Sequence, residues 1–138
     1  FEGLLDFIES SIFGLVRQID EREPAGPAQA AHVVAAVLQF GEKNRGLARV
    51  MAGDALVLEH ERLQERMNRL FDKLEAALRQ GLRDGAAQEG AALTPDADAK
   101  VQASILVAFV IGRLQRYARS GFRRLPTEQL EACLARVL

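Results

Sequence analysis

Few residues of this sequence have the types and spacing that catalysis or metal binding would need. The two histidines, His32 and His60, are far apart, and neither has a second histidine or a cysteine at metal-ligand spacing. We interpret both as helix-surface or packed side chains. Cys133 is the only cysteine, which excludes an internal disulfide and fits a reducing cytosol. It lies in an amphipathic stretch without a histidine partner, so we expect a small core residue, and we predict neither a metal site nor a cofactor.

Phosphate-binding and acid–base patterns are also missing from the sequence. No glycine-rich motif such as GxxxxGK[ST] occurs, because the glycines stand singly. The carboxylates are numerous but alternate with cations on faces that we expect to be solvated. The sequence therefore predicts that the chain is not an enzyme.

One stretch, residues 113–124, is rich in arginine and holds five of them. Such a cluster fits contacts to an acidic partner or to a DNA backbone. It also fits the end of a helix, where cations complement the helix dipole. The second interpretation is favoured, because the net charge of −1 leaves the whole chain without a basic footprint for nucleic acid.

The elements that position these residues are predicted to be helices. The chain of 138 residues has the size of one domain, and 49% of it is apolar and 27% charged, as in ordinary globular proteins. β-branched alternation is nearly absent, which favours an all-α fold. The longest uninterrupted apolar run, residues 105–112, is much shorter than the ~18 residues of a membrane span.

Apolar residues recur at steps of three and four in six stretches, which predicts six helices. These cover about residues 2–22, 28–41, 47–52, 55–83, 95–121 and 126–138. Asp54 is a candidate N-cap, and Thr94 before Pro95 is a typical helix start. Gly81, Gly85 and Gly90 predict a flexible connection. The long helix is expected to be the spine along which the others pack.

The helix predicted over residues 95–121 is apolar on every side between Ile105 and Gly112. In so small a domain, one face of it can meet the core and the other needs a partner, most simply a second copy. Ala108 and Gly112, four residues apart, would allow two helices to approach closely. We therefore predict that the last two helices form a hairpin that builds a four-helix bundle in a dimer.

Two motifs are more distinctive than the periodicity. They are Phe40-Gly41-Glu42-Lys43-Asn44-Arg45-Gly46-Leu47 and, in the long helix, Arg62-Leu63-Gln64. With residues 1–12 and 119–127 they resemble the nucleoid occlusion factors of the TetR family over essentially the whole chain. The resemblance implies an all-α TetR-type C-terminal domain over residues 1–138. It also implies a helix-turn-helix DNA-binding domain that is absent here, so we expect this chain to be a piece of a longer protein.

The same resemblance implies a homodimer that binds DNA through the absent domain and the tubulin-like division GTPase FtsZ through this one. Such a protein is cytoplasmic and nucleoid-associated, has no membrane contact, and antagonises division-ring assembly over the nucleoid. The FtsZ tail is expected in a groove between the first two helices. The groove residues implied by position are Phe7, Ser11, Ala36, Gln39, Lys43 and Asn44, whereas Leu15 stands where the family has a basic residue. The dimer residues are Ser104, Ile105, Ala108, Phe109, Gly112 and Arg116.

An alternative function is a TetR-type transcriptional repressor whose domain senses a small molecule. Such a sensor needs an internal cavity with a few convergent polar groups. The predicted apolar stripes offer few inward polar candidates, so this alternative ranks second.

Overall fold

The computed structural model describes residues 2–53, 60–89 and 95–138, and over these ranges the chain forms six helices and no strand. The all-α prediction is confirmed. The predicted caps Asp54 and Thr94 lie outside the described residues. The helices are α1 (Glu2–Arg22), α2 (Pro27–Lys43), α3 (Arg45–Met51), α4 (His60–Glu89), α5 (Pro95–Arg119) and α6 (Leu130–Ala135).

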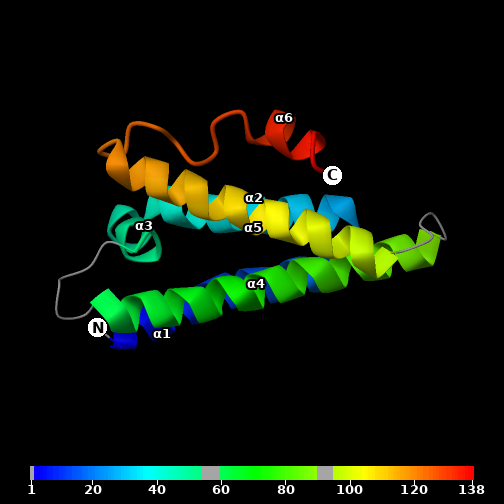
Figure 1. Ribbon diagram of the computed structural model, residues 1–138, viewed down its shortest axis with the longest axis horizontal. Helices are drawn as coiled ribbons and strands as arrows, with labels where there is room; N and C mark the ends of the chain where they lie inside the picture. The colour runs from blue at the N-terminus through cyan, green and yellow to red at the C-terminus, as the bar shows by residue number, and fades with distance from the viewer. Residues whose placement is uncertain (1, 54–59, 90–94) are drawn as a thin grey trace.

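Two antiparallel helix pairs make up most of the fold (Figure 1). The α4–α5 pair lies in front of the α1–α2 pair in this view, α3 closes one end, and α6 lies beside α2. Helix α4 has 30 residues and is about 45 Å long, and it packs along α5 and α2. The prediction that this helix is the spine is therefore confirmed.

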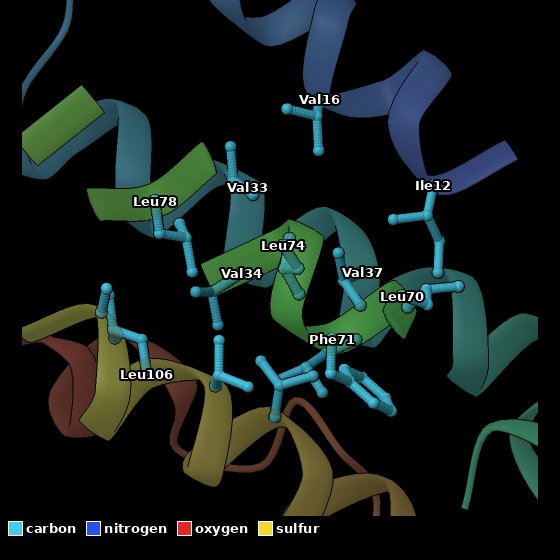
Figure 2. Packing of buried hydrophobic residues seen from close by; sticks show 14 of the residues in the cluster. Ile12, Val16, Val33, Val34, Val37, Leu70, Phe71, Leu74, Leu78 and Leu106 are labelled. Atoms are coloured by element: carbon cyan, nitrogen blue, oxygen red, sulfur yellow. The ribbon is translucent and has the colours of Figure 1, made fainter. Parts of the chain in front are cut away.

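The core is the apolar stripe of α4 packed against α1, α2 and α5. Figure 2 shows ten labelled residues that meet there: Ile12, Val16, Val33, Val34, Val37, Leu70, Phe71, Leu74, Leu78 and Leu106. All of them are at most 7% exposed. Among the described residues, no helix combines the length and apolar composition that crossing a membrane requires.

The predicted flexible connection is wrong at Gly81 and Gly85, because α4 continues through both glycines to Glu89, while Gly90 lies outside the described residues. A Cβ placed on Gly85 would lie 2.5 Å from the Cα of Gly26 and 2.8 Å from the carbonyl oxygen of Ala25. Gly85 therefore lets the turn between α1 and α2 touch the α4 backbone. Glycine serves close packing here rather than flexibility.

The last helix is shorter than the sequence predicted. Residues 126–129 form turns, and Gln129 has a positive φ of 50°, so α6 begins only at Leu130 and ends at Ala135. The left-handed residue is incompatible with a helix that continues from Pro126. The predicted break between residues 41 and 47 is shorter in the structure, because α2 continues to Lys43, Asn44 caps it, and α3 starts at once with Arg45.

Ion pairs join α1 to α4 along their exposed flank. The Arg66 guanidinium lies 2.7 Å from Glu2, 2.9 Å from Asp6 and 3.5 Å from Glu9. Lys73 lies 3.2 Å from Glu9 and 4.6 Å from the ring centroid of Phe13. These contacts define which flank of α1 faces α4.

A further ion pair at the α4–α5 end carries a pH-dependent prediction. Arg79 donates hydrogen bonds of 3.0 and 2.7 Å to the two carboxylate oxygens of Asp96. The hydrogen bond from Arg79 holds the pKa of Asp96 below its ordinary value. A lowered folded-state pKa stabilises the fold at neutral pH, and this contribution disappears as the pH falls from the ordinary aspartate range through the lowered pKa.

We expect Asp96→Asn to lower the urea midpoint slightly at pH 7 and low salt, because an exposed pair is strongly screened. The difference from the parent chain should vanish in about 1 M NaCl and in acid. Urea unfolding followed by circular dichroism measures both. A difference that persists in high salt would assign the effect to packing rather than to charge.

Candidate functional site

One flank of α1 forms the first side of the candidate site. Leu4, Phe7 and Ser11 are spaced three and four apart, so they share a flank, and it is neither the core flank nor the one that faces α4. Phe7 is 54% exposed and Leu4 38%, while Ser11 is half-buried. Two large apolar side chains on one exposed flank make an apolar patch of the kind found at interaction sites.

Helix α2 supplies the second side. Ala36, Phe40 and Lys43 are spaced four and three apart, so they share a flank of α2, and this flank borders the hollow that Ala35 and Gln39 line with α6. Ala36 is half-buried and Lys43 is exposed. The Phe40 ring is half-buried and packs against the core.

Helices α1 and α2 pack against each other as an antiparallel pair, so the two flanks belong to neighbouring helices. Phe7 stands about fifteen residues before the end of α1, and Lys43 stands about the same number of residues after the start of α2. Because the two helices are antiparallel, both residues lie at the same level along the helix pair. We call Leu4, Phe7, Ser11, Ala36, Phe40 and Lys43 the α1–α2 face. It combines exposed apolar surface with a cation at one end.

The Lys43 end of the α1–α2 face is fixed by α5. The hydroxyl of Tyr117, a residue only 1% exposed, donates a 2.8 Å hydrogen bond to the carbonyl oxygen of Glu42. The Thr127 hydroxyl lies 2.8 Å from the Glu42 carboxylate. Two contacts from one side therefore hold the last turn of α2 in place.

Asn44 has a structural role beside the predicted binding role. Its side-chain amide donates a 2.8 Å hydrogen bond to the Phe40 carbonyl oxygen, and its backbone N–H donates to Gly41 at 3.2 Å. Both bonds satisfy carbonyls at the end of α2. Asn44 thus terminates the helix at the border of the α1–α2 face.

The predicted residue Gln39 lies three residues after Ala36 and four before Lys43, so it shares their flank of α2 and borders the α1–α2 face. Its exposed side chain lines the hollow between α2 and α6, together with Ala35, Leu130 and Leu134. That hollow has a volume of about 740 Å³ and is open to solvent.

Sequence reasoning missed two residues of the α1–α2 face, Leu4 and Phe40. Leu4 lies at the edge of the buried stripe of α1, which consists of Leu5, Ile8, Ile12 and Val16, and it stays exposed. The signal that identifies them is spacing: Leu4 precedes Phe7 by three residues, and Phe40 follows Ala36 by four.

A second exposed surface runs along α5. Val101 is 60% exposed and Ile105 47%, whereas Leu106, Val107 and Val110 are buried. Of the predicted dimer residues, Ser104, Ile105, Ala108, Gly112 and Arg116 are all exposed and share one flank. Phe109 is half-buried beneath the Arg113 guanidinium, 4.6 Å from its ring centroid. We call the exposed flank with Val101 the α5 face.

The histidine and cysteine side chains do not gather at either surface. The His32 ring contacts the Glu23 carboxylate through Nδ1 at the turn between α1 and α2, while the side chain of His60 lies outside the described residues. Cys133 is half-buried, and its Sγ lies 3.3 Å from Arg113 Nη2. In the part of the chain that the structure describes, no three His, Cys, Asp or Glu side chains are grouped to hold a metal ion.

The sequence was also compared with known proteins. A family model described as "Tetracyclin repressor-like, C-terminal domain" of the SlmA-like type matches residues 28–136. A protein named nucleoid occlusion factor SlmA from Alteromonas mediterranea is 39% identical over 129 residues, which are 94% of this chain and 65% of that protein. The protein of the same name from Salmonella paratyphi B is 40% identical over 132 residues, 96% of this chain and 66% of its own length. The chain therefore spans slightly less than two thirds of these relatives.

Proposed function

The chain belongs to the SlmA-like family of tetracyclin repressor-like C-terminal domains, and from this premise we propose that it is the partner-binding and dimerising part of a nucleoid occlusion factor. In this proposal the α1–α2 face binds the C-terminal tail of FtsZ. A DNA-binding part ahead of α1 brings the protein to the chromosome. The identity of 39–40% along nearly the whole chain to proteins named nucleoid occlusion factors is the observation that carries the proposal.

The chemistry of the α1–α2 face supports a peptide ligand. A short segment with apolar and acidic residues needs apolar contacts for affinity and a cation for orientation. Phe7 and Leu4 offer the first, and Lys43 offers the second. Because Lys43 lies in the last turn of α2, its charge also complements the helix dipole.

The small-molecule sensor is less well supported. Ligand pockets usually have volumes of about 300–1,000 Å³ and bury most of their ligand. The enclosed hollow lined by Val16, Gln29, Val33 and Leu78 has a volume of only about 10 Å³, the space of one water molecule. The larger hollow beside α6 is open to solvent.

A peptide titration tests the proposed site. We expect the FtsZ C-terminal peptide to bind saturably, and Phe7→Ala to weaken binding by about tenfold or more, as for a central apolar anchor. Lys43→Glu should also weaken peptide binding, and the loss should be larger at lower salt concentration, because attraction between Lys43 and an acidic peptide becomes repulsion. Fluorescence anisotropy with a labelled peptide measures both.

Leu125→Ala is the matched control, since Leu125 is 46% exposed but lies on the segment after α5. It should leave binding unchanged. Absence of saturable binding to the parent chain would reject the proposed function. Equal binding by the parent chain and both α1–α2 variants would place the site elsewhere.

We also propose that the α5 face is the dimer interface. An exposed apolar stripe with small residues at Ala108 and Gly112 lets two copies of α5 pack closely. Since α6 has only six residues, α5 supplies most of this contact.

A further inference from the structure

The charges of this chain are distributed very unevenly. Residues 43–53 and 112–127 contain eight lysines and arginines and no aspartate or glutamate, although the whole chain has a net charge of −1. The rest of the chain therefore has a net charge of −9. Charge separation of this size creates a local positive field that the net charge conceals.

The fold brings the two basic segments together at one end of the molecule. Helix α3 packs against α5, and Ala52 and Gly53 line a hollow with Ala118 and Arg119. The Arg45 guanidinium lies 5.3 Å from the ring centroid of Phe122, just beyond α5. Figure 1 places α3, the end of α5 and the beginning of α1 at this same end.

Several of these arginines are exposed and unneutralised. Arg116, Arg119 and Arg123 form no ion pair with any side chain that the structure describes. The two carboxylates nearest in sequence to residues 112–127 are Glu128, which binds Arg124 at 3.2 Å, and Glu131 on α6. Arg113 differs, because it donates to the carbonyl oxygens of residues 126 and 128 and so holds the chain after α5. Arg116 belongs to the proposed dimer interface on the α5 face, so we call only Arg45, Arg119 and Arg123 the arginine end.

The helix dipole explains only part of this cluster. Arg116 and Arg119 lie in the last turn of α5, where cations are favourable. Arg45, however, is the first residue of α3, where the dipole disfavours a cation. Arg123 lies beyond α5 altogether. Three separate segments contribute to this cluster, and in one of them the helix dipole is unfavourable for a cation. The helix dipole alone therefore does not explain the cluster.

We propose that the arginine end binds the phosphate backbone of duplex DNA. Guanidinium groups bind phosphate oxygens in a bidentate manner, and exposed arginines that are not neutralised retain their charge for this contact. The choice of DNA over an acidic protein rests on the proposed function, in which the DNA-binding part precedes α1 and so brings the duplex to this end. The contact is independent of sequence, and it adds affinity to whatever base recognition the DNA-binding part provides.

The 138-residue chain itself tests this proposal. We expect weak binding to a fluorescent duplex of arbitrary sequence, with affinity that falls steeply between about 25 and 200 mM NaCl. The double variant Arg119→Glu with Arg123→Glu should lower the affinity for DNA by at least about tenfold. It should also reduce the slope of log affinity against log salt concentration by about two, one for each lost phosphate contact. The control, Arg17→Glu with Arg22→Glu, changes the net charge equally at exposed positions of α1 and should have little effect.

Three results would overturn the proposal: no binding to duplex DNA at about 25 mM NaCl, equal losses in both double variants, or tighter binding to poly-glutamate than to DNA. Circular dichroism of each variant confirms that the fold is retained. The FtsZ peptide titration separates this inference from the proposed function. The arginine variants should bind peptide normally, and Phe7→Ala should bind DNA normally.

Discussion

Replacing Gly85 by alanine should lower the free energy of unfolding by about 1–3 kcal/mol, the usual cost of forcing extra atoms into a packed site. At a glycine inside a helix with free space around it, the same change would raise the free energy of unfolding by up to about 1 kcal/mol. At Gly85 the new Cβ would stand 2.5 Å from the Gly26 Cα and 2.8 Å from the Gly26 nitrogen. Backbone atoms cannot rotate away as a side chain can, and Gly26 has a φ of 147° that other residues rarely adopt.

Gly14→Ala provides the matched control, because Gly14 also lies inside a helix but its Cβ would meet nothing within 4 Å. This variant should be as stable as the parent chain or more stable, by up to about 1 kcal/mol. Chemical denaturation of all three chains measures the two effects, which are expected to have opposite signs. A Gly85→Ala chain as stable as Gly14→Ala would contradict the close contact between α4 and the turn.

Ile105→Glu should convert the proposed dimer to a monomer. A glutamate at the centre of an apolar interface would bury an unpaired charge, so we expect the dissociation constant to rise by at least about a hundredfold. In a single copy Ile105 is 47% exposed, so the fold itself should tolerate the change. Light scattering at a chain concentration of roughly tens of micromolar measures the molecular mass in solution. The concentration must be stated, because the fraction of dimer depends on it.

Phe7→Glu is the control for the dimer, since it also replaces an exposed apolar side chain by glutamate but on α1. It should remain a dimer and lose the FtsZ peptide. A parent chain that is monomeric at these concentrations would reject the α5 face as an interface. Dimers of both variants would locate the interface elsewhere.

The sequence predicted best those features that depend on one helix alone. The stripe of α4, including Leu70 and Leu74, is buried because a long run at steps of three and four has only one way to face a core. The two-sided character of α5 was predicted for the same reason, since Ile105 to Gly112 cannot all face inward. The break between α2 and α3 was also predicted, since the predicted helices end at about residue 41 and begin again at about residue 47.

Features that depend on two segments were missed. Gly85 resembled a helix break in sequence, and only the neighbouring turn shows that it is a contact. Leu4 fitted the buried stripe of α1, but the edge of a stripe is buried only where a neighbouring helix covers it. The arginines of residues 113–124 were assigned to the helix dipole, because the sequence does not show that α3 places Arg45 beside them.

The hydrogen bond from Tyr117 to Glu42 has a consequence for how two binding sites would work together. It ties the end of the α1–α2 face to α5, and α5 also carries the proposed dimer interface. In the proposed dimer, the two α1–α2 faces would then stand at a set separation, with no flexible linker between them. A partner that displays many tails along a filament would bind both faces only when its tail spacing and linker length reach that separation. The gain would come from effective concentration, without any new contact.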